Sequence, residues 1–339
     1  MKCVKILTGK PFLLTMLVLL LMAAGVLGWM LVPEDAEGMR RSAAIVQTTT
    51  WHEVKVDGKP LLYFRSTLGD SALVGVTHRR DSAVHRRYAA GCWLKGAWPF
   101  STCDGRIATV DGAEKSARLR KNADVRKMCL DAVEQELKVL KGQNAELDYY
   151  LRVHGVQDNG YQQIAALAQQ VRRDYEERLR AKAILDSVGA KARFSVATNC
   201  SYKALYRDEN GKLRSVRCRF VAAVRQPDIV LLATADGVTP DGTEPMRLLP
   251  WRHRGGGAIR VAGFGGLGVS GLECDTVSAR IVAGHATKYG RHDIPAVLAS
   301  GGRPVFTARG RFVGITVGDE TADRTVLRKL TEKEGNLWR

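Results

Sequence analysis

The hydrophobic period of this chain changes twice, and this change constrains the fold more than any other feature. Residues 51–113 alternate apolar and polar side chains around glycine-containing turns, as half-buried strands do. Residues 114–190 place apolar side chains every three or four positions, with a break at His154-Gly155, which predicts an antiparallel helical hairpin. Strand-like runs return over residues 191–320. The order predicts a mainly β domain with a helical insertion and argues against βαβ alternation.

An uncharged apolar run covers residues 12–32, which is long enough to cross a bilayer as a helix. The preceding residues 1–11 carry Lys2, Lys5 and Lys10 and no acidic residue, which predicts a cytoplasmic tail. A cleaved signal peptide is the alternative, although its apolar region is usually about 7–15 residues long. Both interpretations export the rest of the chain. We therefore expect a single-pass membrane protein whose bulk is periplasmic or extracellular.

The chain has 339 residues and a formal net charge of +17, which raises the question of a nucleic-acid partner. More than half of this excess is spread as single arginines over residues 191–339, without the aromatic–basic interleaving of RNA-binding surfaces. We expect no nucleic acid, and in an exported chain an acidic polymer or an anionic envelope surface fits the charge better. A solvated basic surface with no dedicated partner is the interpretation that we favour. The remaining segments are a linker at residues 33–50 and a C-terminal helix or tail at residues 321–339.

Six cysteines follow the apolar run, an even number in a compartment that can be oxidising. Cys200 and Cys218 flank two strand-like runs around an Asn-Gly turn, and Cys92 and Cys103 bracket another short turn. These two pairs are candidate disulfides, and buried thiols that never pair are the alternative. The cysteines and histidines have no metal-ligand spacing, so no metal site is expected. A G-x-G-x-x-G run at residues 263–268 lacks the helical pattern that dinucleotide binding needs after it, so no cofactor is expected.

Three short motifs follow one another along the chain, namely Asp-Gly-Arg-Ile-Ala-Thr at residues 104–109, Asp-Ile-Val-Leu-Leu at residues 228–232 and Ser-Gly-Gly-Arg-Pro-Val-Phe at residues 300–306. In this order they resemble three parts of the trypsin-like serine peptidases, including the bacterial HtrA-like ones. The first resembles the strand that leads to the catalytic histidine, the second the strand with the catalytic aspartate, and the third the block around the nucleophile. The resemblance covers residues 90–113 and 191–318. It implies a chymotrypsin-like double β-barrel, interrupted by the long helical hairpin and preceded by the N-terminal transmembrane helix.

The resemblance also implies roles for particular residues. Asp228 and Ser300 would be the catalytic carboxylate and nucleophile, and Gly301 and Gly302 would belong to the oxyanion loop. The histidine position of the family falls on Gly112, which has no proton acceptor. The catalytic triad therefore looks degenerate, and Asp228 and Ser300 are vestigial candidates.

The serine block departs from the family pattern as well. Leu298 and Ala299 replace the Gly and the acidic or amide residue that precede the serine, and Arg303 is an extra residue before the proline. This loop normally directs backbone N–H groups at the oxyanion, so a one-residue displacement should spoil it.

These departures predict a pseudoprotease, a membrane-anchored envelope protein that binds proteins or peptides or acts as a scaffold. The alternative is an active trypsin-like serine endopeptidase that uses Ser300 and Asp228 with a base not recognised in the sequence. A third interpretation is an interaction protein with an unrelated all-β fold. The helical hairpin would either pack on the β domain or form a coiled-coil arm for self-association or partner docking.

Overall fold

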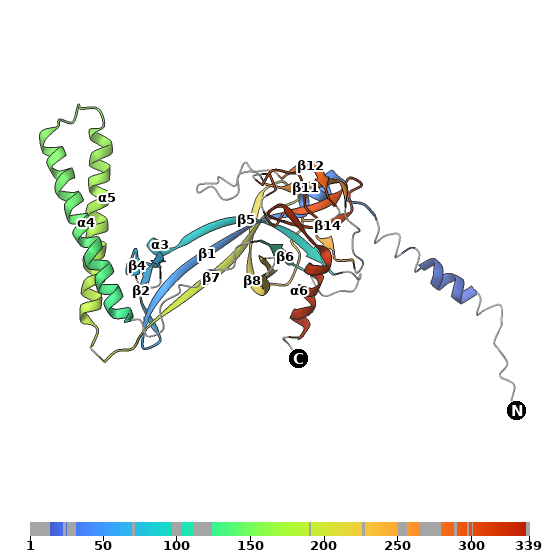
Figure 1. Cartoon of the computed structure of the whole chain (residues 1–339), viewed down its shortest axis with the longest axis horizontal. Coiled ribbons are helices and arrows are strands. Elements are labelled where there is room, and N and C mark those ends of the chain that lie inside the picture. The colour runs from blue at the N-terminus through green and yellow to red at the C-terminus, as the bar shows by residue number, and fades with distance from the viewer. Residues whose placement is uncertain are drawn as a thin grey trace. The chain divides into compact units, whose positions relative to one another are not determined.

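The computed structural model describes residues 14–22, 25, 32–69, 72–96, 104–110, 124–189, 191–225, 228–249, 256–264, 279–287, 290–296, 298–299 and 301–336. They form a mainly β structure with a long pair of helices, as the two changes of hydrophobic period predict (Figure 1). Two compact units divide these residues. Unit 1 takes in the described residues up to 46, from 88 to 110 and from 203 onward, and unit 2 takes in residues 47–87 and 124–202.

The residues of the two units alternate along the chain. Residues 51–87 belong to the same unit as the helices and share a core with them. The apolar side chains of these residues pack against the helices. Three long strands continue from one unit into the other.

A closed ring of strands forms the first sheet. The hydrogen-bonded order is β5–β6–β9–β8–β7–β1, and an additional pairing of β1 with β5 closes it. The strands are β1 (Ala43–Val56), β5 (His85–Lys95), β6 (Arg106–Thr109), β7 (Phe194–Arg207), β8 (Leu213–Arg225) and β9 (Asp228–Thr234). Two further strands, β2 (Lys59–Phe64) and β10 (Met246–Arg247), extend this sheet beyond β1 and β5. Closure removes the open edges that a β-sheet otherwise exposes.

A tight turn joins β7 to β8 and fixes their register. The Asp208 carboxylate accepts the N–H groups of Asn210 (3.0 Å) and Lys212 (2.9 Å) and pairs with Arg214. Gly211 takes a φ of +75°, which suits glycine. The Asn-Gly signal in the sequence therefore marks a real hairpin.

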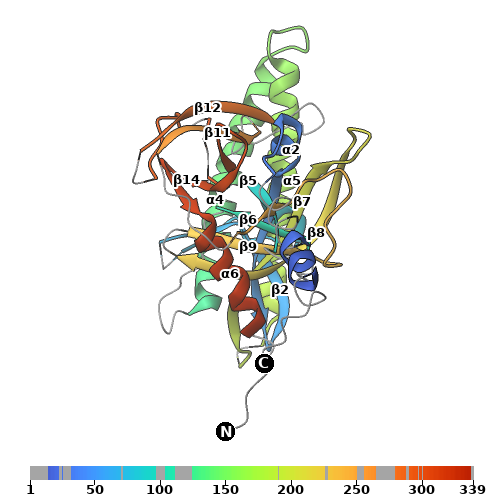
Figure 2. The same cartoon turned by 90° about the vertical axis from the view of Figure 1, so that its right-hand side faces the viewer.

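The second sheet of unit 1 has the order β12–β11–β13–β14–β15 (Figure 2). Its strands are β11 (Gly257–Gly263), β12 (Arg280–Ala286), β13 (Pro304–Thr307), β14 (Phe312–Val317) and β15 (Glu320–Asp323). Two isolated bridges, Ala286 with His292 and Arg291 with Glu320, connect the two outer strands through a short segment.

One apolar core serves both sheets of unit 1. Buried side chains from the closed ring, such as Leu94, pack in the same cluster as Phe306 and Ile315 of the second sheet. Two helices complete it. Helix α2 (Ala36–Arg41) contributes Met39, and α6 (Arg324–Asn336) contributes Leu327 and Leu330.

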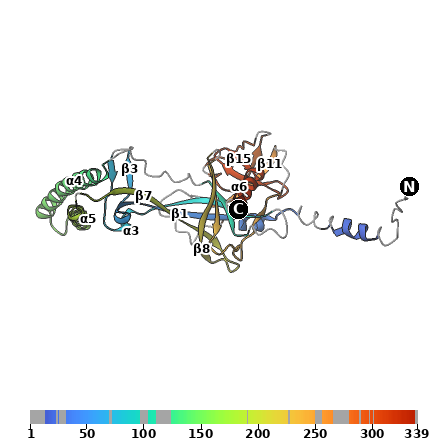
Figure 3. The same cartoon turned by 90° about the horizontal axis from the view of Figure 1, so that it is seen from below.

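Unit 2 is built on the helical hairpin of α4 (Val125–Val153) and α5 (Tyr161–Ser187) (Figure 3). Asp124 caps α4 by accepting the N–H of Lys127 (3.0 Å), and Gly160, with a φ of +87°, precedes α5. Short elements β3 (Ser66–Leu68), β4 (Ala72–Val74) and α3 (Arg80–Ala83) lie in the same unit. The core of unit 2 joins apolar side chains of α4 and α5 to those of the strand region, namely Val54, Leu62, Phe64, Leu73, Val76, Val125, Cys129, Ala132, Val133, Ala181 and Leu185.

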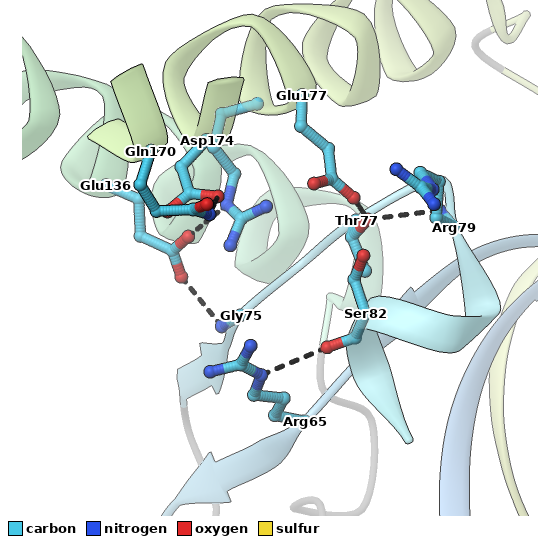
Figure 4. A network of polar contacts seen from close by, with 10 residues as sticks. Arg65, Gly75, Thr77, Arg79, Ser82, Glu136, Gln170, Asp174 and Glu177 are labelled. Carbon is cyan, nitrogen blue, oxygen red and sulfur yellow. Dashed lines mark hydrogen bonds and ion pairs between the residues drawn. The ribbon is translucent and has the colours of Figure 1, made fainter. Parts of the chain in front are cut away.

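Carboxylates of both helices hold the segment around β4 (Figure 4). Glu136 of α4 accepts the N–H of Gly75 (2.7 Å) and a guanidinium hydrogen bond from Arg178 of α5. Glu177 of α5 accepts the hydroxyl of Thr77, whose oxygen accepts the N–H of Arg79 (3.0 Å). The helical pair is therefore attached to the strands by ionic hydrogen bonds as well as by apolar packing.

Within the described ranges, no helix has the length and hydrophobicity to span a bilayer. Residues 14–22 are helical, whereas residues 12–13, 23–24 and 26–31 of the apolar run lie outside the described residues. The transmembrane segment at residues 12–32 therefore stays a prediction.

Candidate functional site

Three pieces of unit 1 meet where the resemblance assigns the catalytic residues. The first is the end of β6 and the second is the beginning of β9, because Thr109 of β6 pairs with Val230 of β9 in an antiparallel register. In this register, the chain that leaves β6 through Val110 runs toward the end of β9 that begins at Asp228. Asp228 is half-buried and is the Cα partner of Arg225 on β8.

The third piece is the turn at Gly301-Gly302. A Cβ on Gly301 would lie 2.8 Å from Cβ of Val110. A Cβ on Gly302 would collide with the carbonyl oxygen of Ala90 and lie 3.2 Å from the backbone N of Val110. Glycine is needed at both positions, because the turn lies directly on the end of β6. The hydroxyl of Thr109 donates to the same Ala90 carbonyl (2.7 Å), which fixes the contact from the other side.

The backbone N–H groups around this turn are engaged inside the protein. Leu298 and Ala299 both donate to the carbonyl of Pro295, at 2.8 and 3.0 Å. Gly302 donates to the carbonyl of Thr316 (2.8 Å), and Arg303 donates to the Thr316 hydroxyl (3.1 Å). These four donors are therefore directed at the chain itself rather than at a bound anion.

Arg303 is buried, with an exposed fraction of 3%, and its side chain braces the same loop. Its guanidinium donates to the carbonyls of Leu298 and Phe264. Burial lowers the pKa of Arg303 from its ordinary value. Both acceptors are neutral carbonyls, so the hydrogen bonds hold the loop and the end of β11 together without an ion pair.

Of the predicted site residues, the structure describes Asp228, Gly301 and Gly302. Gly112 and Ser300 lie outside the described residues, and so does the predicted disulfide partner Cys103. The pieces of chain that lead to Gly112, Asp228 and Ser300 nevertheless come together in one unit.

The structure describes both residues of the predicted Cys200–Cys218 pair. Both carry thiols, as Cys92 does. The thiol of Cys218 accepts a hydrogen bond from the backbone N–H of Ala204.

Burial also keeps these thiols protonated. It raises the pKa of Cys218 to about 11 and raises the pKa of Cys92 well above its ordinary value. Cys200 lies against another residue, with its sulfur 3.8 Å from the hydroxyl oxygen of Thr50. The alternative of buried thiols that do not pair is therefore the one that the structure has.

Sequence reasoning missed the function of Arg303. It marked this residue only as an insertion between the glycine pair and Pro304. The available signal was an arginine at the start of the apolar run Pro304-Val305-Phe306, where a charged side chain is buried only if its donors are satisfied. Among the described residues, no group of three or more His, Cys, Asp or Glu side chains lies close enough to hold a metal ion.

Comparison with known proteins gives weak likenesses. No protein-family profile matches the chain, and no curated protein matches it. Among solved structures, it is similar to the MamO protease domain from Magnetospirillum magneticum in its apo form, with 16% identity and a TM-score of 0.29, over 38% of this chain and 74% of that one. It is also similar to Deg5, with 11% identity and a TM-score of 0.35, over 86% of this chain and 88% of that one.

Proposed function

We propose that this chain is a membrane-anchored envelope protein whose trypsin-like domain binds proteins or peptides, or serves as a scaffold, without cleaving them. The proposal combines three parts, namely the fold, the loss of catalysis and the location. Each part has its own support.

The order of the strands supports a trypsin-like fold. The segment that resembles the strand before the catalytic histidine is β6, and the segment that resembles the aspartate strand is β9, which is its neighbour in the closed ring. The segment that resembles the nucleophile block leads into β13 and packs on the end of β6. An unrelated all-β fold would have no reason to bring these three segments together.

The observation that carries the loss of catalysis is the hydrogen bond from Leu298 N–H to the Pro295 carbonyl, at 2.8 Å. Leu298 stands two residues before Ser300, where the family has the glycine of the oxyanion loop. Oxyanion stabilisation needs N–H groups that are free to bind the developing negative charge. A donor already bonded to a backbone carbonyl supplies nothing to that charge.

Two further features support the same conclusion. Arg303 holds the Leu298 carbonyl from inside the protein, which fixes the loop in this conformation. At the histidine position the sequence has Gly112, and a Ser–His–Asp mechanism has no general base without an imidazole there.

The location rests on the apolar run at residues 12–32 and on the lysines before it. The helical hairpin offers a surface for self-association or for a partner. Its buried residues on α4 lie between Val125 and Val133, whereas Val139, Tyr149, Val153 and Val156 further along are exposed. We propose the distal half of the hairpin as the contact region.

A fluorophosphonate probe tests the loss of catalysis. The full chain, purified in detergent, should remain unlabelled while an active trypsin-like peptidase in the same tube is labelled. The matched variants are Ser300→Ala and Ser215→Ala, the second being an exposed serine on β8. Labelling of the wild type that Ser300→Ala abolishes and Ser215→Ala retains would establish the active endopeptidase instead.

A further inference from the structure

Strand β12 lies at the end of the second sheet, next to β11 (Figure 2). On its inner side it pairs with β11 along its whole length, and helix α2 contacts it as well. On its outer side, the backbone hydrogen bonds among the described residues are at the C-terminal end of the strand. There the N–H of Asp293 donates to the carbonyl of His285 (3.1 Å), and the N–H of His285 donates to the carboxylate of Asp293 (2.7 Å).

These two hydrogen bonds reveal the direction of the remaining backbone groups. Because His285 bonds outward, and because backbone groups alternate sides along a strand, the N–H and C=O groups of Ile281 and Ala283 also point away from β11. The pairing with β11 gives the same direction. Ala258 lies opposite His285, and its carbonyl accepts the N–H of Ala308, on the side of β11 that faces away from β12. In the part of the chain that the structure describes, no group bonds to Ile281 or Ala283 on this outer side.

A pocket of about 670 Å³ lies beside this open edge. The first residues of β12, α2 and the β7–β8 turn line it together, all within unit 1. Its apolar lining comes from Ala43, Phe264, Ala279 and Ile281. A pocket of this size and character accepts side chains of a ligand that lies along the edge.

Most of the carboxylates in the pocket lining are already neutralised. Glu37 pairs with Arg40 (3.4 Å) and with Arg41 (3.1 Å), both on α2. Asp208 pairs with Arg214 (3.0 Å), which lies outside the lining.

The arginines exceed what these carboxylates balance. Arg280 also lines the pocket, and Glu209 is the remaining carboxylate of the lining, while the guanidinium of the lining residue Arg207 donates to the carbonyl of Gly211 (2.6 Å). Arg280 is exposed and belongs to the open strand itself. The pocket therefore presents a positive rim next to unpaired backbone donors and acceptors.

We propose that the outer edge of β12 at residues 280–283 binds an extended acidic peptide of a partner protein, which adds to the sheet as a strand. The peptide backbone bonds to Ile281 and Ala283, and its side chains alternate between the pocket and solvent. Arginine pairs with peptide carboxylates and selects acidic sequences. The inference rests on the binding part of the proposed function and names its partner, at a surface other than the nucleophile loop.

The test measures fluorescence anisotropy of a fluorescein-labelled peptide with four Glu-Val repeats, titrated with the full chain in detergent. We expect saturable binding, weaker by about tenfold or more for the matching Lys-Val peptide. Ile281→Pro removes the outward N–H without touching the bonds to β11, and it should weaken binding about tenfold or more. Ile281→Ala keeps this N–H and only shortens a side chain of the pocket lining, so it should weaken binding less than Ile281→Pro does. Absence of binding, or binding that Ile281→Pro leaves intact, overturns the proposal.

A second pair of variants tests the charge without altering the backbone. Arg280→Glu should weaken binding about tenfold or more. Arg260→Glu, an exposed arginine on the neighbouring strand, should leave it unchanged. Equal losses in both variants would contradict a specific site.

Sedimentation velocity tests whether a second copy of the chain binds the edge instead. Dimerisation that Ile281→Pro abolishes would assign the edge to a second copy and overturn the proposal of a peptide partner. Fluorophosphonate labelling is measured in a separate experiment. Loss of edge binding therefore contradicts the peptide site, whereas labelling of Ser300 contradicts the loss of catalysis.

Discussion

Arg303 illustrates how one residue can redirect a loop. A buried guanidinium loses its hydration and needs acceptors, and the nearest ones are the carbonyls of Leu298 and Phe264. The hydrogen bond to Arg303 directs the Leu298 carbonyl toward the interior, and the Leu298 N–H donates to the carbonyl of Pro295. The same side chain lies under Gly263, where a Cβ would lie 2.7 Å from Cδ of Arg303. The buried Arg303 side chain therefore requires a glycine at position 263.

Gly302 is the glycine of this region with the least room. It has a φ of +94°, and any Cβ would collide with the Ala90 carbonyl. Gly302→Ala should lower the free energy of unfolding by about 3 kcal/mol or more, because strain and collision act together. Gly318→Ala is the control, with a φ of +62° and open space around it, and should cost about 1 kcal/mol. Urea denaturation of the purified chain compares them, and similar losses would show that the Ala90 contact is not tight.

His52 makes the stability of unit 2 depend on pH. Its ring stacks on Phe64, its Nδ1 lies 2.9 Å from the Thr198 hydroxyl, and burial lowers its pKa from 6.5. Since the unfolded chain binds the proton more readily, stability is full above pH 6.5 and falls as the pH drops from 6.5 through the folded-state pKa. His52→Asn, which keeps a polar atom near Thr198, should flatten this fall.

Thermal unfolding of the wild type and of His52→Asn, from about pH 7.5 to about pH 5, measures the effect. His85→Asn, at an exposed histidine of the same unit, controls for the loss of a histidine. A fall with the same slope in wild type and His52→Asn would locate the pH dependence elsewhere.

At the scale of elements, the two halves of the helical hairpin have different surroundings. Near its base, Cys129, Val133 and Leu185 are buried in the core of unit 2. Further along, Ala168 and Val171 of α5 are also buried, and ion pairs such as Arg172 with Asp148 (2.5 Å) join the two helices. Apolar side chains recur every three or four positions along both helices. This periodicity therefore does not predict which half of the hairpin packs against the strands.

Glu136 should be the residue that attaches the hairpin most strongly. It is mostly buried and accepts from both Gly75 and Arg178. Glu136→Ala leaves these donors without an acceptor, so we expect a loss of about 1–3 kcal/mol in the free energy of unfolding. Glu134→Ala removes an exposed ion pair with Lys182 on the same helix and should cost at most about 0.5 kcal/mol. Denaturation curves compare the two, and equal losses would contradict a special role for the β4 contact.

At the scale of the whole molecule, three long strands, β1, β5 and β7, continue from one unit to the other. The insertion is therefore wider than the helices. It includes residues 47–87 on one side and the first part of β7 on the other. A strand that serves two cores has no composition change at the boundary, and the sequence gives no signal for it.

The anchor belongs to this scale as well. The full chain should stay with the membrane fraction after alkaline carbonate extraction, because about 20 apolar residues bind hydrocarbon strongly. A variant lacking residues 1–32 should become extractable. Intact mass separates the two interpretations of the apolar run, since a cleaved signal peptide would remove this segment from the mature chain. Extraction of the full-length, uncleaved chain would contradict the anchor.

Periodicity, turn residues and motif order determined much of this protein in advance. The change of period predicts strands, helices and strands, and the order of three short motifs predicts which strands lie near one another, because local pattern follows from local burial. Tertiary structure alone decided that the thiol of Cys218 accepts a hydrogen bond from the N–H of Ala204, and that the N–H of Leu298 donates to the carbonyl of Pro295. It also decided that β12 keeps an open edge at Ile281. Such facts depend on register and on which distant segment arrives, and those are set by packing across the whole core rather than by any window of sequence.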